Sequence, residues 1–395
     1  MGHKSTSSSR GFTLMEMMVS LALGALVLGL AVQLFSQGVD ATWVISQRAE
    51  MQQDLRASTD ILLKDISLAG SGPPWLAQGI ALPSGTGTRP IYGYAPSCAT
   101  NNNCVGVAGA GIAYPCASNV GACIPTLYGI IPGFQLGITP PGSVTKSDVI
   151  TVVYEDTVFA LNCYTISFPA PPAVNPVTFT GPAVPPPASC ILPPGLVYPQ
   201  AVDDPVVGLQ PGDLVLFTNS SGQAVGEVTT AVGGGPYAVT FVNGDPLAIN
   251  QSGAAGDLSA ITAGANTTAN RIWVITYYLY LLPDPTGASA GTPVLMRQVN
   301  GHTPVPVAEN VVNFQFTYDT YNSSGTLLNN AGDAGYSVGT SLNLIRKINL
   351  IHLTIRSQLS GSRSSLISTR GYQTFDLQTS ISARNLSYQN RYSVN

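Results

Sequence analysis

The chain has 395 residues, of which only 9% are charged, with 16 lysines and arginines against 20 aspartates and glutamates. A formal net charge of −4 argues against a nucleic-acid-binding surface, because phosphate recognition needs clustered cations. The 41 glycines and 30 prolines predict many turns and irregular loops.

An apolar segment near the N-terminus is the strongest pattern in the chain. It follows a short polar leader that contains Lys4 and Arg10, and Glu16 immediately precedes an uncharged run from Met17 to Phe35. This run is long enough to cross a bilayer, since about 20 helical residues span roughly 30 Å. The positive charges before it predict a cytoplasmic N-terminus and an exported remainder. A carboxylate at the start of such a helix is costly in lipid, so we expect Glu16 to have a partner.

From Val39 the helix is predicted to continue as an amphipathic segment. The glycines and prolines of residues 70–74 are typical of a helix end, so the predicted helix runs from Thr13 to Ala69. Its second half is expected to pack on a β-sheet through apolar residues that recur at helical spacing. These residues are Met51, Leu55, Leu62, Ile66 and Ala69.

Six cysteines lie in the predicted exported part, where an oxidising compartment favours disulfides. Six cysteines allow fifteen connectivities, and the sequence does not select among them. Closeness in sequence favours the pairs Cys98–Cys104, Cys116–Cys123 and Cys163–Cys190. A zinc or haem site is disfavoured, because there is no CxxC pair and the three histidines are scattered.

Residues 71–270 are predicted to form a loop-rich insertion that contains the disulfides. Ser147–Tyr154 is the first clear strand, since it is rich in β-branched residues, and Val158–Phe168 is its expected hairpin partner. Thirteen prolines between Pro169 and Pro211 predict an excursion without a central strand. A short meander is then expected over Asp213–Asn219, Gln223–Ala231 and Tyr237–Val242.

Residues 271–395 are predicted to form an antiparallel sheet. Arg271–Leu282 is the strongest strand in the chain, and Thr292–Val299 is expected to pair with it. A short helical turn is predicted at Val307–Val311, followed by a strand through Tyr318. Two further strands are expected at Ile345–Gln358 and Gly371–Arg384.

Strict alternation along Ile345–Gln358 predicts which side chains share a face. His352 in this strand is expected to make an ordinary hydrogen bond. One face is expected to carry Ile351, Leu353 and Ile355, and the other Ile348, Leu350, His352, Thr354 and Arg356.

No catalytic constellation occurs in the sequence, and the protein is not expected to be an enzyme. Phosphate-binding loops and the HExxH zinc motif are absent. Residues Gly287–Gly291 match GxSxG, but a nucleophile elbow joins a strand to a helix, whereas this string joins two predicted strands. No cofactor or metal is expected. Calcium is the alternative, at Asp203, Asp204 and Asp333, although their spacing matches no calcium-binding loop.

The start of the apolar segment resembles the prepilin signature of type IV pilins and pseudopilins. A basic leader ends in Gly11 and is followed by Phe12, Thr13, two hydrophobic residues and Glu16. The resemblance implies cleavage between Gly11 and Phe12 by a prepilin peptidase, and N-methylation of Phe12. It also implies that Glu16 pairs with the N-terminal amine of a neighbouring subunit. Such a pair relieves the desolvation of both charges in an apolar bundle.

Two simpler interpretations are weaker. A secretory signal has a shorter apolar core and a small-residue cleavage site. A plain membrane anchor explains the length of the apolar run but not the glycine–phenylalanine junction or the glutamate.

The order of the predicted elements is similar to that of PilW-like minor pilins and J-type pseudopilins of type II secretion. This implies an α+β, pilin-like fold in which a long N-terminal transmembrane and amphipathic helix packs on an antiparallel β-sheet ectodomain with a large loop- and proline-rich insertion. The implied function is that of a minor pilin, at or near the tip of a type IV pilus, that helps to initiate assembly. The alternatives are a J-type pseudopilin, or a tip adhesin or DNA-uptake subunit.

The resemblance also implies where the protein resides and what it contacts. It would be a single-pass inner-membrane protein with a periplasmic ectodomain, and later part of the pilus at the cell surface. Its partners would be prepilin peptidase, the inner membrane, and other minor and major pilins through the N-terminal helix, with no nucleic acid. The expected segments are the leader 1–11, the transmembrane half of the helix 12–38, the amphipathic half 39–70, the insertion 71–270 and the C-terminal sheet 271–395.

Overall fold

The computed structural model divides the chain into two compact units. The first comprises Met1–Gln53 with Ser357–Gln373, and the second comprises Asp54–Arg356 with Thr374–Asn395. The structure describes residues 11–72, 79–81, 126–133, 135, 137–182, 190, 192, 200–234, 236–243, 245, 249–250, 257–283, 291–321, 326–331, 345–356, 374–383 and 385–386.

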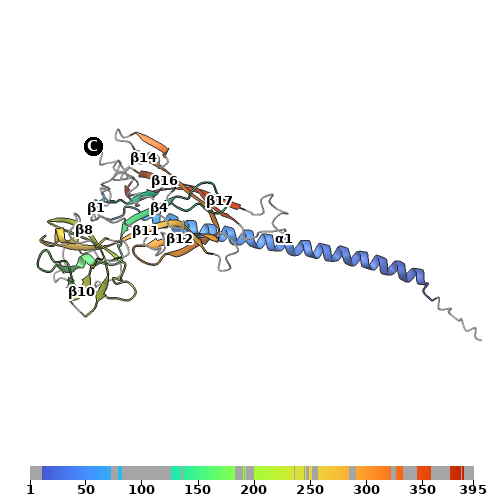
Figure 1. The fold of residues 1–395 in the computed structure, drawn as a ribbon, viewed down its shortest axis with the longest axis horizontal. Coiled ribbons are helices and arrows are strands. Elements are labelled where there is room, and N and C mark those ends of the chain that lie inside the picture. Colours follow the sequence, from blue (N-terminus) through green and yellow to red (C-terminus); the bar gives the residue numbers. More distant parts are fainter. Residues whose placement is uncertain are drawn as a thin grey trace, which may run out of the picture. The chain divides into compact units, whose positions relative to one another are not determined.

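A single helix, α1 (Leu14–Leu68), begins in the first unit and ends in the second (Figure 1). The prediction of one helix from Thr13 to Ala69 is therefore confirmed to within one residue at each end. The helix ends at Gly70, whose φ of 70° favours glycine, and the Ser71 amide donates to the Leu68 carbonyl at 2.9 Å. In the second unit its predicted apolar face is buried, at Leu55, Leu62, Ile66 and Ala69.

Strands are the main regular elements among the described residues of the second unit, so the predicted α+β class is confirmed. Among the described residues they form antiparallel sheets of two, four, seven and four strands. The strands are β1 (Ile80–Ala81), β2 (Thr126–Leu127), β3 (Ile130–Gly133), β4 (Val149–Glu155), β5 (Tyr164–Ser167), β6 (Val177–Pro182), β7 (Leu214–Asn219), β8 (Gly222–Glu227), β9 (Thr230–Val232), β10 (Tyr237–Thr240), β11 (Thr268–Leu282), β12 (Thr292–Val299), β13 (Val305–Glu309), β14 (Val311–Tyr321), β15 (Leu327–Ala331), β16 (Ile345–Arg356) and β17 (Thr374–Ser382), and two short 3-10 helices lie at Leu161–Cys163 and Leu258–Ile261.

The central sheet is built around β11, the strand that the sequence predicts most strongly. Its order is β13-β12-β11-β4-β3, and β7 pairs with both β11 and β8. One edge of β11 carries β4, and the other carries β7 along Thr268–Ile272 and then β12 along Ile275–Leu282. The predicted pairing of the second strand, β12, with β11 is confirmed.

Asn300 fills the gap between β7 and β12 on that edge. Its backbone amide donates to the Val274 carbonyl at 2.8 Å, and its side-chain carbonyl accepts from the Val274 amide at 2.7 Å. Its side-chain NH₂ donates to the Ile272 carbonyl at 3.1 Å. This residue has a φ of 47°, which asparagine tolerates better than most side chains, and so it continues the hydrogen bonding of β11 where no strand is present.

The prediction that Val158–Phe168 forms a hairpin with the first strand is wrong. The first strand, β4, pairs with β3 and β11, whereas β5 pairs with β6 in a small sheet of order β5-β6-β10-β9. The proline-rich segment also contains an internal strand of that sheet, β6, because the residues from Val177 to Thr180, which follow Pro176, are β-branched or aromatic and suit a strand.

The predicted meander is divided between two sheets. The β7–β8 hairpin belongs to the central sheet, whereas β9 and β10 belong to the small sheet, so the single expected strand Gln223–Ala231 is split after Glu227. A shared aromatic core fills the space between them: Phe217 packs edge-on against Phe241 and Phe168, with ring centroids 5.4 Å apart in both pairs. Burial of this core explains why both sheets form here.

The region 71–270 and the region 271–395 share one sheet in the described residues. The strands β3, β4, β7 and β8 come from the first region. Of these, β4 and β7 pair directly with β11 of the second region, whereas β3 pairs with β4 and β8 pairs with β7. The expected boundary at residue 270 lies inside β11.

The predicted helical turn at Val307–Val311 is wrong. Residues Val305–Glu309 form the edge strand β13, which pairs with β12, and Val311 begins β14. The single residue between them, Asn310, has a φ of 57° and bends the chain between the two sheets. Pairing with β12 therefore overrides the local sequence pattern.

The terminal sheet has the order β15-β14-β16-β17, and a bulge in β16 corrects the predicted faces of that strand. Gln315 pairs with His352, but the next residue, Phe316, pairs with Leu350, so Ile351 has no partner on β14. The extra residue reverses the alternation. As a result, four side chains that were expected on opposite faces are all buried, namely Ile348, Leu350, Leu353 and Ile355.

Asp148 links this sheet to the central sheet at the same bulge. Its carboxylate accepts hydrogen bonds from the amides of Phe316 at 2.8 Å and Gln135 at 2.9 Å, and its own amide donates to the Phe314 carbonyl at 2.9 Å. Burial raises the pKa of Asp148 to about 6, against the opposing effect of the two amide donors.

A buried carboxylate, Asp65, joins the C-terminal part of α1 to the central sheet. It accepts a hydrogen bond from the Tyr277 hydroxyl at 2.5 Å and pairs with the Arg297 Nε at 2.7 Å, and the Tyr154 hydroxyl lies at 3.4 Å. Burial, and secondarily the negative charge of Asp65, raises the pKa of both tyrosines, so their hydroxyls remain donors. The helix is thereby fixed in register on β4, β11 and β12.

Replacing Asp65 with alanine is expected to lower the free energy of unfolding by about 3 kcal/mol, because Arg297 and Tyr277 lose their acceptor in a buried site. Urea denaturation of the full chain in detergent micelles measures this. The control is Asp60→Ala, which removes an exposed carboxylate from the same helix and is expected to change stability by less than about 0.5 kcal/mol. Equal midpoints for the two variants would contradict the role of Asp65.

Candidate assembly site on the N-terminal helix

The residues that the sequence analysis singles out lie at the start of α1. Gly11, Phe12 and Thr13 precede the first helical residue, and all three are exposed. The Phe12 side chain is 87% exposed, and a Cβ atom built on Gly11 would meet nothing within 4 Å. The peptide bond between Gly11 and Phe12 is therefore accessible in this structure.

Thr13 and Glu16 form a capping box at the helix start. The Thr13 amide and hydroxyl both donate to Oε2 of Glu16, at 3.0 and 3.1 Å, and the Glu16 amide donates to the Thr13 hydroxyl at 3.2 Å. This arrangement pairs amides that the helix itself leaves without acceptors. It also places a negative charge at the positive end of the helix dipole, which is favourable. Within the chain itself, Glu16 is therefore hydrogen-bonded to Thr13.

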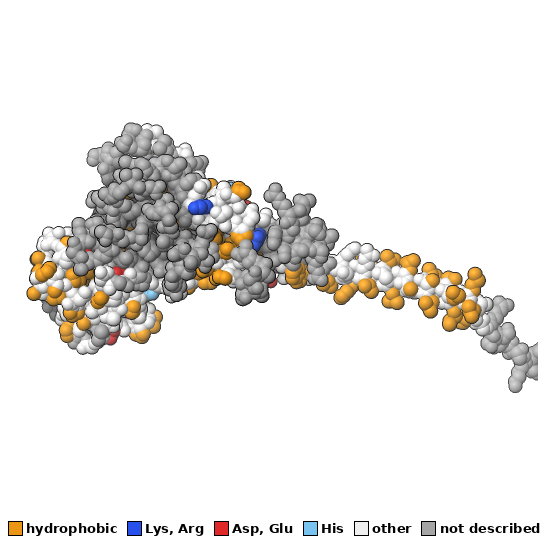
Figure 2. Space-filling view, in the orientation of Figure 1, with side chains coloured by type: hydrophobic (Ala, Val, Ile, Leu, Met, Phe, Trp, Pro, Cys, Tyr) orange, Lys and Arg blue, Asp and Glu red, His pale blue; other side chains and the backbone are white. Residues whose placement is uncertain are grey.

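The helix beyond Glu16 exposes apolar side chains in all directions. Its large apolar side chains between Met17 and Phe35 are exposed, and the helix is long and apolar enough to cross a membrane. Figure 2 shows hydrophobic side chains along the visible face of this segment. The Ser20 hydroxyl on this segment is paired within the helix, since it donates to the Met17 carbonyl at 3.0 Å. A helix that is apolar all round is typical of a membrane span or of the centre of a helical bundle.

One carboxylate oxygen of Glu16 is hydrogen-bonded to Thr13, and the other can form an ion pair with a cation. Both hydrogen bonds from Thr13 go to Oε2. An ammonium that approaches the other oxygen would form a charge-assisted bond without first breaking the capping box. The arrangement therefore suits a single intermolecular ion pair in apolar surroundings.

A family model, described as the prokaryotic N-terminal methylation motif, matches residues 6–32. The chain carries a prepilin-type N-terminal motif. This motif supports a type IV pilin or pseudopilin, and together with the apolar helix it indicates a membrane-anchored protein. No curated protein and no solved structure matches the chain.

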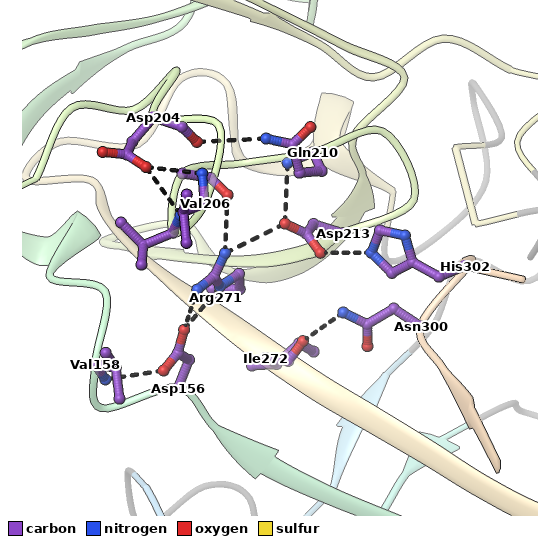
Figure 3. A network of polar contacts seen from close by, with 12 residues as sticks. Asp156, Val158, Asp204, Val206, Gln210, Asp213, Arg271, Ile272, Asn300 and His302 are labelled. Atoms are coloured by element: carbon purple, nitrogen blue, oxygen red, sulfur yellow. Dashed lines mark hydrogen bonds and ion pairs between the residues drawn. The ribbon is translucent and has the colours of Figure 1, made fainter. Parts of the chain in front are cut away.

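Away from the prepilin-type motif, a second polar cluster surrounds Arg271 in the second unit (Figure 3). The buried guanidinium donates from Nε to Asp156 at 2.7 Å and from Nη1 to the Gly208 carbonyl at 3.0 Å, and it lies 3.4 Å from Asp213. Its plane also stacks on Trp273, 4.6 Å from the ring centroid. Because all three nitrogens are engaged inside the protein, we interpret this cluster as structural.

The histidines in the described residues pair with carboxylates. His302 lies 2.8 Å from Asp213 at the edge of the Arg271 cluster, and His352 lies 2.9 Å from Asp376 on the terminal sheet. The ordinary hydrogen bond predicted for His352 is therefore confirmed. His352 and Asp376 lie on β16 and β17, whereas His302 and Asp213 lie outside the strands.

One of the three alternative calcium ligands, Asp204, makes hydrogen bonds within its own loop. Asp204 accepts from the amides of Val206 at 2.8 Å and Val207 at 3.0 Å, and these bonds lower the pKa of its carboxyl. Such bonding is typical of a turn. Asp333 lies outside the described residues, and within the described part no group of three or more potential ligands could hold a metal ion.

One of the predicted disulfides is confirmed. Cys163 and Cys190 are bonded, with Cα atoms 4.5 Å apart, and this ties the proline-rich segment to the start of β5. The other candidates, Cys98, Cys104, Cys116 and Cys123, lie outside the described residues, as do residues 287–290 of the GxSxG string.

Sequence reasoning missed the two buried ion clusters around Asp65 and Arg271. A signal for Arg271 was present, because a lone arginine opens a strand that is otherwise apolar, and such a charge must be paired when buried. Its partners lie 58 and 115 residues away in sequence, which no local pattern reveals. Asp65 lies likewise beside the buried helix face. The groups that donate to its carboxylate, Tyr277 and Arg297, come from the distant strands β11 and β12.

Replacing Thr13 with alanine is expected to cost about 1 kcal/mol of local helix stability, because the N-cap hydroxyl is lost. The Glu16 amide, which donates to the Thr13 hydroxyl, should then exchange about fivefold faster with deuterium, measured by mass spectrometry of the N-terminal peptide in micelles. Ser20→Ala is the matched control, since that hydroxyl bonds within the helix interior. Thr13→Ser should behave like the native chain, and unchanged exchange in Thr13→Ala would refute the capping role.

Proposed function

We propose that this protein is a minor pilin of the PilW type, a subunit that is stored in the inner membrane and later incorporated into a type IV pilus. The observation that carries the proposal is the prepilin-type motif at residues 6–32, which includes most of the apolar run Met17–Phe35 on a helix whose large apolar side chains are exposed there. Such a surface is stable only in lipid or among other apolar helices.

Transfer of this helix from lipid into a filament requires little change in its surroundings. Lipid tails and neighbouring apolar helices are about equally apolar, so hydrophobic burial neither opposes nor drives the transfer. A specific interaction must then set the register of the incoming subunit. We propose that the Glu16 carboxylate supplies it by pairing with the N-terminal amine of a neighbouring pilin, after cleavage at Gly11 and methylation of Phe12.

The ectodomain supports a position at or near the pilus tip. The second unit carries three sheets of four or more strands among its described residues, which is a large volume attached to one helix. A repeating shaft brings the heads of successive subunits close together, whereas the tip leaves one side open. At the tip the protein would help to initiate assembly together with other minor pilins and would have a structural rather than an enzymatic role.

A J-type pseudopilin of a type II secretion system is the second candidate. The prepilin-type motif favours it equally, because the two classes share this motif and the helix that follows. Neighbouring genes for secretion-system components, rather than for pilus retraction motors, would favour the pseudopilin.

The mature N-terminus tests the assignment directly. Intact-mass and N-terminal peptide mass spectrometry of protein from cells is expected to show a chain that begins at Phe12 and carries one methyl group. The same measurement in cells without prepilin peptidase should show the uncleaved leader. A mature chain that retains Met1, or one that begins near Asp40, would exclude the pilin assignment.

Replacing Glu16 with alanine is expected to reduce incorporation into sheared filaments more than about tenfold, because losing one ion pair in apolar surroundings costs more than about 1.4 kcal/mol. Quantitative immunoblotting of filament and membrane fractions measures this, and the membrane amount should be unchanged. The control, Glu50→Ala, removes an exposed carboxylate from the same helix beyond the span. Native incorporation of Glu16→Ala would argue against the assembly role.

A further inference from the structure

The exposed apolar surface of α1 continues past the length of one hydrocarbon layer. Val39 is 46% exposed, Trp43 is 41% exposed and Ile45 is 67% exposed, although all three follow the run that ends at Phe35. A helix that only needed to cross the bilayer would become polar at this point. These side chains therefore need their own explanation.

Trp43 lies on a continuous apolar stripe that comes from the membrane-spanning run. Val32, Phe35, Val39 and Trp43 follow one another at intervals of three and four residues, so they lie on one face of the helix. The neighbouring hydroxyl of Thr42 is turned inward, where it donates to the Gly38 carbonyl at 2.9 Å. The stripe thus ends in a tryptophan, whose indole combines a large apolar body with one N–H donor.

The length of the helix places this tryptophan at a defined depth. If Met17 marks the inner hydrocarbon boundary, Trp43 lies about 39 Å further along the axis, or about 37 Å along the bilayer normal at a tilt of about 20°. A hydrocarbon layer of about 30 Å plus one headgroup layer of about 5–7 Å ends at about 35–37 Å. Asp40, the first ionisable residue after Glu16, falls within the same headgroup layer.

We propose that Trp43 is an interfacial anchor that lies in the outer headgroup layer of the membrane before assembly. This inference depends on the membrane placement in the proposed function and adds the outer boundary of the span. Tryptophan is favoured at that depth because its ring packs against lipid while its N–H contacts water and headgroups. Together with Glu16 at the inner boundary, it would fix how deeply the helix is inserted.

Fluorescence quenching by brominated lipids tests this depth in the full chain. The protein is reconstituted in vesicles of phosphatidylcholine and phosphatidylglycerol that carry bromine either next to the headgroup or near the end of the acyl chains. The chain has three tryptophans, so the Trp43 signal is taken as the difference between the native protein and Trp43→Phe. We expect bromine near the headgroup to quench this signal at least twice as strongly as deep bromine.

Moving the indole along the helix gives matched controls. Val39→Trp combined with Trp43→Phe places it one turn deeper, and we expect deep bromine to quench it more strongly than it quenches native Trp43. Gln47→Trp combined with Trp43→Phe places it one turn further out, and we expect bromine at either depth to quench it only weakly. These variants leave the second unit unchanged, so its fold is not at risk.

Two results would overturn the anchor. Strongest quenching of native Trp43 by deep bromine would place it inside the hydrocarbon, and absence of quenching with blue-shifted emission would show that protein covers it instead. Vesicle flotation and the mature N-terminal mass distinguish these results from failure of the proposed function. A protein that floats with the vesicles and begins at Phe12 but shows unquenched Trp43 would contradict the anchor alone.

Discussion

A buried carboxylate on the helix determines how the second unit is organised. Asp65 accepts from Tyr277 and pairs with Arg297, which face each other on β11 and β12, and Tyr154 of β4 lies beside it. Three strands of the central sheet are therefore fixed to one helical turn. Since an unpaired charge here would be costly, the helix has only one favourable register on the sheet.

The same helix has to satisfy a different environment at its other end. The apolar side chains around Glu16 are exposed. The Glu16 carboxylate and backbone amide are hydrogen-bonded to Thr13 in the capping box. Two carboxylates on this helix, Asp65 and Glu16, therefore have opposite roles. Asp65 is fully engaged inside the protein, whereas Glu16 keeps one oxygen available for a partner outside it.

The strand β11 gives the remaining structure its continuity. It carries β7 and β12 in succession on one edge, and Asn300 supplies the hydrogen bonds in the gap between them. At the same end of β11, the buried Arg271 joins the turn at Asp156 to the loop at Gly208. Regions that lie far apart in the sequence are thereby joined through one strand, which explains why the loop-rich region shares the central sheet.

The sequence by itself determined the helix, its apolar half, the strongest strands and the residues of the prepilin-type motif, because each is encoded in neighbouring residues through periodicity or spacing. Only the tertiary structure decided which strands pair, where the bulge at Ile351 reverses the faces of β16, and that Val305–Glu309 is an edge strand. It also decided the partners of Asp65 and Arg271. These features depend on contacts between residues distant in sequence, whose energies override local preference and leave no local pattern to read.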